Sequence, residues 1–201
     1  MTETAARPSM TGRDWYDRPG MTLARDLLGC RLVHVSADGT VGGPIVETEA
    51  YRGPEDLAAH SARGRTARNA VMFGPPGFLY VYLIYGIHLC LNVVAGPGTK
   101  PEAVLIRALA LDEGLELARA RRGPAAADRR LASGPGNVGR ALGLDRTHNG
   151  ADLLSGPFRI EPRTRRPHVA RGPRVGVDYA GTWAARPMRF WIADDPHVSR
   201  R

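Results

Sequence analysis

Cysteine, lysine and uninterrupted apolar runs are all scarce in this 201-residue chain. Its two cysteines, Cys30 and Cys90, have no metal-ligand spacing, which excludes a disulfide scaffold and fits a reducing compartment such as the cytoplasm. The one stretch of membrane length, residues 78–96, is interrupted by polar and aromatic residues, so two buried strands and a turn explain it better than a membrane span. Residues 1–20 lack the apolar core of a signal peptide, and we expect no targeting signal.

Acidic residues are too few to balance the basic ones. Lysine and arginine number 28, with Lys100 as the single lysine, whereas aspartate and glutamate number 20, which gives a formal net charge of +8. A basic surplus of this size predicts a polyanionic partner such as nucleic acid. Hydrophobic residues at 43% and charged residues at 24% are typical of a globular protein. We expect a flexible arm over residues 1–20 and a single domain over residues 21–201.

Helical and strand-like patterns follow one another without the strand–helix–strand rhythm of a parallel sheet. The expected helices cover 21–29, a short stretch from Pro54 toward His60, 112–123, 124–132 and a glycine-opened stretch over 134–143. The expected strands cover 30–36, 41–51, 79–84, 87–94, 103–110 and the tail segments FRIEP, RVGV and MRFWIA. Asp38-Gly39 marks one hairpin turn, and Tyr85-Gly86 lies at or near the tip of a second, protruding hairpin. We therefore predict an α+β fold with a curved, mainly antiparallel sheet and flanking helices.

Two carboxylates and an aromatic ring share one face of the strand over 41–51. Glu47, Glu49 and Tyr51 alternate with Thr48 and Ala50, which point the other way. Carboxylates two positions apart on a strand are separated by roughly 6.5 Å, close to the spacing at which inverting glycosidases flank a water molecule. The same spacing also fits a solvated strand face with arginine partners, which spacing alone favours. The apolar residues that precede Glu47 in the strand favour a catalytic interpretation.

Tyrosines gather on one face of the strand over 79–84. Tyr80 and Tyr82 lie opposite Leu79 and Val81, an arrangement found both in stacking platforms for nucleic-acid bases and in ordinary cores. The aromatic set alone favours the core. Combined with the net charge and with an aromatic residue, Tyr85, at a hairpin tip, it favours a base-binding cleft.

Other motifs in the sequence say less about function. The stretch 134–139, GPGNVG, matches the G-x-G-x-x-G pattern for dinucleotides, but no strand precedes it and no parallel unit surrounds it, so we reject that assignment. Its glycines and the helix N-terminus that follows could still receive a DNA phosphate. The histidines His34, His148, His168 and His197 are scattered singly, and no zinc, P-loop or nucleophile-elbow motif occurs in the sequence. We therefore expect neither a metal site nor a cofactor.

Several segments, taken together, resemble one known family. They are VETEAYRGPEDLAAHS, TARNAVMFGPPGFLYVYLIYGIHLCLN, VLIRAL, SGPGNVGRALG and RVGVDYAGTWAARPMRFW. Their order and spacing are similar to those of the alkyladenine (3-methyladenine) DNA glycosylase family from about Leu23 to Ser199, although residues 1–20 and 145–172 match poorly. The resemblance implies a monomeric, nucleoid-associated enzyme of base excision repair. Such an enzyme flips a damaged, alkylated or deaminated purine out of double-stranded DNA and hydrolyses its N-glycosidic bond, without binding a membrane.

The resemblance also implies catalytic residues. Glu49 matches the general base that activates a water molecule for attack on the flipped sugar. Arg107, in VLIRAL, matches a residue that helps to hold that water, and the backbone carbonyl of Val175 looks like a third contact to it. The family requires only one essential carboxylate, so the resemblance leaves Glu47 without a catalytic role.

Binding residues follow from the same resemblance. Tyr51 and Tyr82 match the aromatic residues that sandwich the base, and His60 matches a polar contact to its edge. Asn92 matches the side chain that crowds the exocyclic amine of normal guanine. Tyr85 matches the DNA-binding wedge that fills the gap left in the duplex.

Two other functions fit part of the sequence. A non-catalytic nucleic-acid-binding protein would keep the basic cleft and the stacking tyrosines but would gain nothing from an anion in the cleft. A hydrolase of free nucleosides would need neither Tyr85 nor the surplus charge. The scarcity of lysine predicts a monofunctional glycosylase, because strand cleavage coupled to base loss needs an amine and Lys100 lies in a turn rich in glycine and proline.

Overall fold

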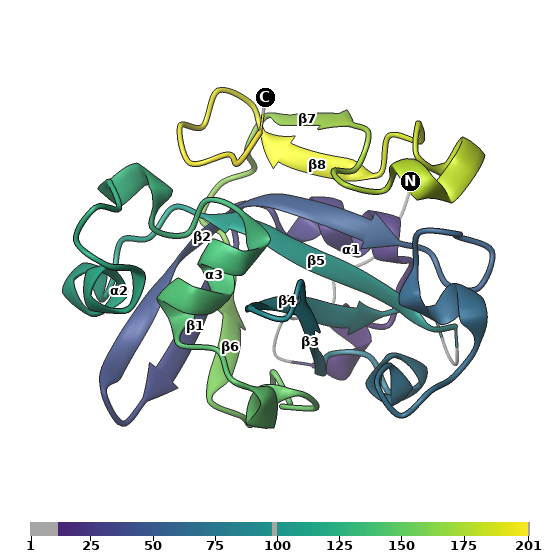
Figure 1. Cartoon of the computed structure of the whole chain (residues 1–201), viewed down its shortest axis with the longest axis horizontal. Coiled ribbons are helices and arrows are strands. Elements are labelled where there is room, and N and C mark those ends of the chain that lie inside the picture. Colours follow the sequence, from purple (N-terminus) through teal and green to yellow (C-terminus); the bar gives the residue numbers. More distant parts are fainter. Residues whose placement is uncertain (1–11, 98–99, 201) are drawn as a thin grey trace, which may run out of the picture.

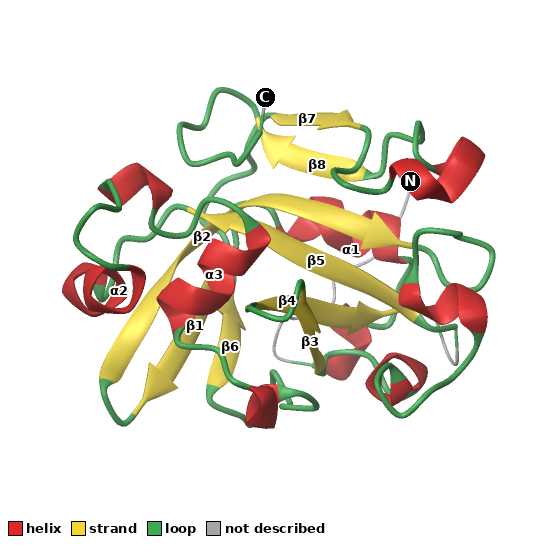
Figure 2. Ribbon diagram, in the orientation of Figure 1, coloured by secondary structure: helices red, strands yellow, loops and turns green. Residues whose placement is uncertain are grey.

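A single antiparallel sheet organises the computed structural model, which describes residues 12–97 and 100–200 (Figures 1 and 2). The strand order is β3-β4-β5-β2-β1-β6, with β8 beside β2 and β7 beside β8. The strands are β1 (Arg31–Ser36), β2 (Gly39–Tyr51), β3 (Leu79–Ile84), β4 (His88–Ala95), β5 (Glu102–Leu109), β6 (Phe158–Glu161), β7 (Val169–Gly172) and β8 (Arg189–Ile192). Every strand pair is antiparallel, which confirms the predicted α+β class and the mainly antiparallel sheet.

Helices cover both faces of this sheet. The α-helices are α1 (Gly20–Leu27), α2 (Leu115–Arg122) and α3 (Pro135–Leu142). Short 3-10 helices cover Arg13–Trp15, His60–Arg63, Ala70–Phe73, Asp128–Arg130, Arg146–His148 and Asp178–Trp183. Figure 1 shows α3 in front of β4 and β5, with α1 behind the sheet. Among the described residues, no helix combines the length and the apolarity needed to cross a bilayer.

Buried apolar side chains on β1, β2, β4 and β5 form the main core with those of α1 and α3. In α1, Leu23, Ala24 and Leu27 are fully buried, a spacing that puts them on one helix face. Helix α3 lies close to β4 because Gly139 has no side chain, since a Cβ atom there would stand 2.2 Å from the carbonyl oxygen of Leu89. The core therefore packs directly against β2, β4 and β5, which carry functional side chains.

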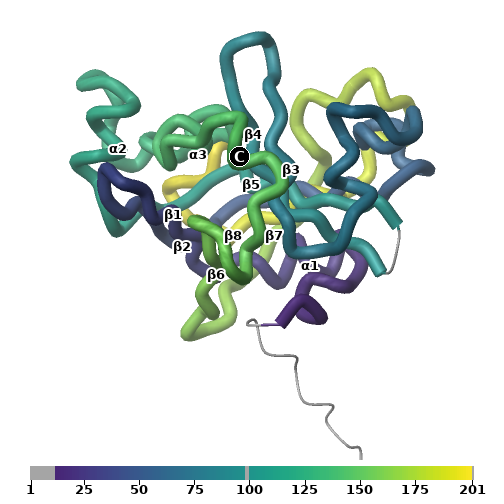
Figure 3. Tube along the Cα trace, turned by 90° about the horizontal axis from the view of Figure 1, so that it is seen from below, coloured from purple at the N-terminus to yellow at the C-terminus, as the bar shows by residue number. Residues whose placement is uncertain are grey.

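The β3–β4 hairpin protrudes from the sheet (Figure 3). Its turn is closed by the N–H of Ile87, which donates to the carbonyl oxygen of Ile84 at 3.2 Å. Tyr85 and Gly86 occupy the two central positions with φ of 52° and 72°, the sign pattern of a type I′ turn. A left-handed conformation costs a tyrosine roughly 1–2 kcal/mol, so the turn holds Tyr85 at the apex at some energetic expense. The Tyr85 side chain is 83% exposed.

The start of the described chain differs from the expected arm. Residues 1–11 of that arm lie outside the described residues, but residues 12–20 are packed on the domain. Trp15 and Tyr16 are buried against the core, and Arg13 forms an ion pair with Asp152 at 2.8 Å. Aromatic burial anchors this segment, so the expectation of a flexible arm up to residue 20 is wrong for residues 12–20.

Three predicted helices differ from the structure. The stretch from Pro54 forms turns, because the carboxylate of Asp56 accepts the backbone N–H groups of Arg52 and Ala58. Helix α2 begins at Leu115 after Gly114, since the carboxylate of Asp112 pairs with Arg31 instead of capping a helix. Residues 124–132 contain only a short 3-10 helix, which buries no side chain of its own.

The tail strands are shifted relative to the prediction. FRIEP and MRFWIA contain β6 and β8 as expected, whereas RVGV is not a strand. The strand that pairs with β8 is β7, which lies between FRIEP and RVGV in the sequence. RVGV leaves the sheet because Arg174 is buried against Asp56 and the N–H of Val175 donates to the Glu49 carboxylate.

Candidate active site

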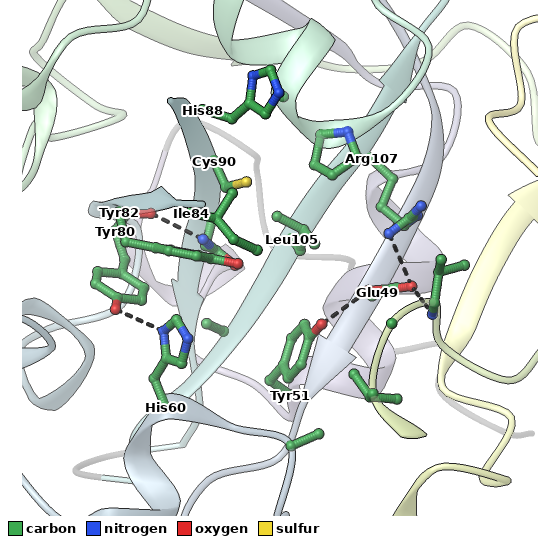
Figure 4. A pocket seen from close by; sticks show the side chains of 18 of the residues that line it. Glu49, Tyr51, His60, Tyr80, Tyr82, Ile84, His88, Cys90, Leu105 and Arg107 are labelled. Carbon is green, nitrogen blue, oxygen red and sulfur yellow. Dashed lines mark hydrogen bonds and ion pairs between the residues drawn. The ribbon is translucent and has the colours of Figure 1, made fainter. Parts of the chain in front are cut away.

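A cavity of about 480 Å³ opens between β2, β3, β4, β5 and the loop over 175–179 (Figure 4). Its volume falls within the usual range for small-ligand sites, roughly 300–1,000 Å³. It is lined by all eight residues to which the family resemblance assigns a role, namely Glu49, Tyr51, His60, Tyr82, Tyr85, Asn92, Arg107 and Val175. The structure therefore brings together in one place every predicted site residue, whose chemical roles stay predictions.

Glu49 lies in the wall of the cavity with its carboxylate held from three sides. Its Oε1 atom accepts the backbone N–H of Val175 at 2.7 Å and lies 3.2 Å from Nη1 of Arg107, while Oε2 accepts the hydroxyl of Tyr51 at 2.9 Å. An ionised carboxylate offers about four lone-pair sites, so Glu49 can accept a further hydrogen bond. Val175 meets the carboxylate through its N–H group, a contact that the sequence prediction of its carbonyl did not include.

Opposing effects set the pKa of Glu49. Burial raises this pKa, and the nearby Glu47 carboxylate adds to the rise. The Arg107 charge and the hydrogen bonds from Val175 and Tyr51 lower it. Burial prevails, so the pKa lies above that of an ordinary glutamate. A carboxylate whose pKa is raised in this way is a stronger base, as general-base catalysis near neutral pH requires.

Arg107 reaches Glu47 and Glu49 from the neighbouring strand because the β2–β5 pairing is irregular. Glu47 pairs with Ala108 and Thr48 pairs with Ile106, which leaves Arg107 as the extra residue of a β-bulge. The Thr48 side chain points to the opposite face, where its hydroxyl donates to a carbonyl of α1. This alternation confirms that the two glutamates share a face, and the bulge directs Arg107 between them.

Glu47 is as deeply buried as Glu49, since both have 0% exposure. The interpretation of this strand face as solvated is therefore wrong. Glu47 Oε1 contacts Arg107 Nε at 3.0 Å and Arg189 Nη1 at 2.9 Å, and Oε2 accepts the backbone N–H of Ser199 at 2.7 Å. Two guanidinium groups thus compensate its charge.

Aromatic rings form the opposite side of the cavity (Figure 4). Tyr80 and Tyr82 are stacked with their ring centroids 5.4 Å apart, and the ring of His60 meets that of Tyr82 edge-on at 4.5 Å. Tyr51 faces this group from β2, so a flat ligand could stack between tyrosines. Tyr80 and Tyr82 point away from Leu79 and Val81, which belong to the main core, as the alternation predicted.

His60 is held in one orientation by Tyr80. Its Nδ1 atom lies 2.8 Å from the Tyr80 hydroxyl. Burial, with a smaller effect from the Arg68 charge, lowers the pKa of His60, which favours a neutral imidazole. Its Nε2 atom is then available to contact a ligand in the cavity.

Asn92 lines the cavity from β4, directly across from Tyr80 in the sheet. It is buried, and its side-chain Nδ2 donates to the carbonyl oxygen of Tyr80 at 3.1 Å. The amide is therefore fixed by the strand beside it and cannot swing aside easily for a larger ligand.

A buried ion pair supports Tyr51 from behind. Arg174 and Asp56 have fully buried side chains and form two hydrogen bonds, of which one is 2.8 Å and the other 2.5 Å. The Arg174 guanidinium lies 4.7 Å from the centroid of the Tyr51 ring. Neither Arg174 nor Asp56 is predictable as a site residue from local sequence, because their pairing depends on contact between distant loops.

One of the singly scattered histidines, His34, belongs to the core. His34 is buried, stacks on Phe158 with a centroid distance of 4.0 Å and binds the carbonyl oxygen of Leu142. Within the described ranges, no three His, Cys, Asp or Glu side chains lie close enough together to hold a metal ion.

Comparison with known proteins gives a consistent result. The profile of the methylpurine-DNA glycosylase family matches residues 14–196. A protein of Myxococcus xanthus is 48% identical over 188 residues, covering 92% of this chain and 91% of its own. A protein of Methanocella arvoryzae is 48% identical over 190 residues, covering 94% and 95%, and one of Streptomyces avermitilis is 46% identical over 192 residues, covering 93% and 89%. Each of the three carries the name "Putative 3-methyladenine DNA glycosylase".

Proposed function

The chain belongs to the methylpurine-DNA glycosylase family, and from this premise we propose that its cavity receives a damaged purine nucleotide flipped out of duplex DNA. Members of this family are N-glycosyl hydrolases of base excision repair. The proposed reaction is hydrolysis of the bond between the purine and the sugar, which leaves a free base and an abasic site. The observation that carries the proposal is the buried carboxylate of Glu49, held by Arg107, Tyr51 and Val175 in the wall of the cavity.

Glu49 acts as the general base in this scheme. Its carboxylate accepts a proton from a water molecule, whose oxygen then attacks the anomeric carbon of the flipped nucleotide. The bond from that carbon to the purine nitrogen breaks, and the electron pair leaves with the base. The same negative charge stabilises the positive charge that develops on the sugar. Burial strengthens this interaction, because little water is present to screen it.

The aromatic residues bind the flipped base. Tyr51 and Tyr82 lie on two sides of the cavity, and stacking on aromatic rings is worth about 1–3 kcal/mol per base. His60 offers a ring nitrogen to the base edge, and the buried Asn92 forms part of the cavity wall. A positively charged alkylpurine is a good leaving group, so such a base needs little help beyond Glu49. A neutral lesion such as hypoxanthine needs help at the base. The neutral imidazole of His60 can supply it as a hydrogen bond to the base, because its lowered pKa disfavours the transfer of a proton.

Tyr85 is the proposed wedge in the duplex. Flipping costs a few kcal/mol, least for a damaged or mispaired base, and an inserted side chain recovers part of the lost stacking. The exposed ring of Tyr85 at the apex of a rigid turn, next to the exposed Ile87, suits this role. The net charge of +8 favours binding to the phosphate backbone.

Water, not an amine, is the proposed nucleophile. The single lysine, Lys100, pairs with Glu55 at 2.7 Å and with Glu102 at 3.0 Å, and it does not belong to the residues that line the cavity. These partners raise the pKa of Lys100 and keep its amine protonated. A protonated amine outside the cavity cannot form a Schiff base with the sugar, which supports a monofunctional glycosylase.

A purely binding function is less consistent with these observations. A nucleic-acid-binding cleft gains nothing from a buried carboxylate, because an anion repels phosphate and its burial costs free energy. A hydrolase of free nucleosides would not need an exposed wedge. The arrangement of Glu49 and Tyr85 together therefore favours a DNA glycosylase.

The test is an assay for abasic sites. The protein is incubated with duplexes that carry 3-methyladenine, hypoxanthine or ethenoadenine, and abasic sites are then cleaved with alkali. We expect alkali-dependent cleavage at one or more of the lesions and none in an undamaged duplex. Binding of these duplexes without any base release would contradict the proposed function and favour a binding protein.

A further inference from the structure

We propose that Glu47 is a positioning residue, which orients Arg107 toward Glu49 and holds the segment Ser199–Arg200 against the wall of the cavity. This inference rests on the function proposed above and extends it. Glu47 itself is not among the residues that line the cavity, so it does not touch the substrate. Its influence passes through Arg107 and Arg200, which do line the cavity.

The guanidinium of Arg107 is divided among three acceptors, one for each nitrogen. Nε meets Glu47 at 3.0 Å, Nη1 lies 3.2 Å from Glu49, and Nη2 donates to the hydroxyl of Ser199 at 3.1 Å. A planar guanidinium in a fork of this kind cannot rotate without losing at least one contact. Glu47 and Ser199 therefore fix the one nitrogen that Arg107 presents to Glu49.

Without Glu47, Arg107 would be free to turn both terminal nitrogens toward Glu49. Arginine and carboxylate favour such a two-bond pair. That pair would occupy the acceptor site on Glu49 that the attacking water needs, and it would stabilise the charged form of the carboxylate. By holding Nε, Glu47 limits Arg107 to a single contact with Glu49 and preserves the basicity of that carboxylate.

Glu47 also anchors the Ser199–Arg200 segment. Its Oε2 atom accepts the N–H of Ser199 at 2.7 Å. Arg189 donates through Nη1 both to Glu47 and to the carbonyl oxygen of Arg200, each at 2.9 Å. Glu47 and Arg189 thus bind successive residues of this segment, which places Ser199 in reach of Arg107 and Arg200 at the cavity.

Charged and titratable groups from several elements face Glu49, and they define the expected pH dependence. They are Glu47 and Tyr51 on β2, Tyr82 on β3, Cys90 on β4, Arg107 on β5 and Arg174 in the loop before Val175. Of these, Glu47 is the carboxyl group that raises the pKa of Glu49. Its removal should lower the pKa of Glu49 for two reasons. The repulsion between the two carboxyl groups is lost, and Arg107 is free to form a second hydrogen bond with Glu49.

The experiment compares Glu47→Gln with Glu102→Gln in the full chain. Glu102 is a buried carboxylate on β5 that accepts the N–H of Gly20 and lines no part of the cavity, so it controls for the loss of a buried charge in the same sheet. Single-turnover base release from a lesion duplex is measured across pH, together with the Kd for the same duplex and the thermal unfolding of each variant.

For Glu47→Gln we expect base release to fall about 10- to 100-fold near neutral pH, because a displacement of about 1 Å in a catalytic group has an effect of this size. The Kd should change by less than about twofold, and the acidic limb of the rate profile should move to lower pH. Glu102→Gln should leave both the rate and the limb as in the wild type. An unchanged rate, or a lower rate with an unmoved acidic limb, would overturn the proposal.

Two further variants keep the proposal falsifiable if Glu47→Gln does not fold. Ser199→Ala removes one anchor of Arg107 at a partly exposed position, and it should lower base release a few-fold without weakening binding. In an Arg107→Met background, Glu47→Gln and Ser199→Ala should each lower base release by a smaller factor than in the wild-type background, since the part of each effect that passes through Arg107 is already lost. Effects on base release that are as large in the Arg107→Met background as in the wild type would overturn the proposal. Absence of base release by the wild-type protein would instead contradict the proposed function.

Discussion

Removing one hydroxyl group from the cavity gives a sharp test of how Glu49 is held. Tyr51→Phe deletes the hydrogen bond from the Tyr51 hydroxyl to Glu49 Oε2, at 2.9 Å, and keeps the ring that is proposed to stack on the base. This bond lowers the pKa of Glu49. Its loss therefore raises the pKa, and because the carboxylate is the active form, the acidic limb of the rate profile moves to higher pH.

The size of the effect follows from the strength of the bond. A hydrogen bond to a charged group contributes about 1.5–3 kcal/mol, and one pKa unit corresponds to about 1.36 kcal/mol. The acidic limb should thus move upward by about one to two pH units. Base release near the foot of the limb should fall roughly 10- to 100-fold, whereas on the plateau at higher pH it should stay within a few-fold of the wild type.

The assay is single-turnover base release from a lesion duplex, measured from acidic to mildly alkaline pH. Tyr16→Phe is the matched control, because Tyr16 is a buried tyrosine of the core that does not line the cavity. It should leave the limb unmoved. An acidic limb of Tyr51→Phe that stays in place or moves to lower pH would refute the assignment of Glu49 as a base held by Tyr51. The shift is opposite in sign to the one expected for Glu47→Gln.

Three further outcomes test the other proposed roles. Tyr85→Ala should weaken the binding of lesion duplex by about 5- to 100-fold, the value of one stacking contact, and should weaken non-specific binding less; equal losses would mean that Tyr85 is no wedge. Asn92→Ser should raise the release of undamaged guanine, measured as free base from lesion-free duplex, and an unchanged release would remove Asn92 from the selectivity filter. Borohydride added during turnover should trap no covalent protein–DNA adduct; an adduct at a yield comparable to base release, lost in Lys100→Ala, would show that an amine attacks.

Local patterns predicted the parts of the site that lie within one strand or one turn. Alternation along a strand correctly put Glu47, Glu49 and Tyr51 on one face, since that relation depends only on the backbone of β2. The Tyr85-Gly86 tip followed equally well from the short interval between two apolar strands. The resemblance to a known family added Arg107, His60 and further residues, which the structure places around the same cavity.

Relations between distant segments could not be predicted from the residues. Glu47 can be buried because Arg189 and the backbone N–H of Ser199 both donate hydrogen bonds to its carboxylate. These residues lie 142 and 152 positions away in the sequence. Spacing within the strand carries no information about those partners. The composition of RVGV predicts a strand that includes Arg174. The pairing of Arg174 with Asp56, 118 residues away, instead draws this segment out of the sheet. Charge compensation and loop contacts of this kind appear only once the chain is folded.

If the Glu49 carboxylate activates the water that releases the base, Glu49→Gln should remove that activation. The amide keeps the shape of the side chain and loses its basicity, and Arg107 keeps its ion pair with Glu47, so the fold should tolerate the change. Single-turnover base release from a lesion duplex is measured beside the Kd for that duplex. We expect release to fall by at least about 10²-fold while the Kd stays near that of the wild type. Release within a few-fold of the wild type would show that Glu49 is not the general base.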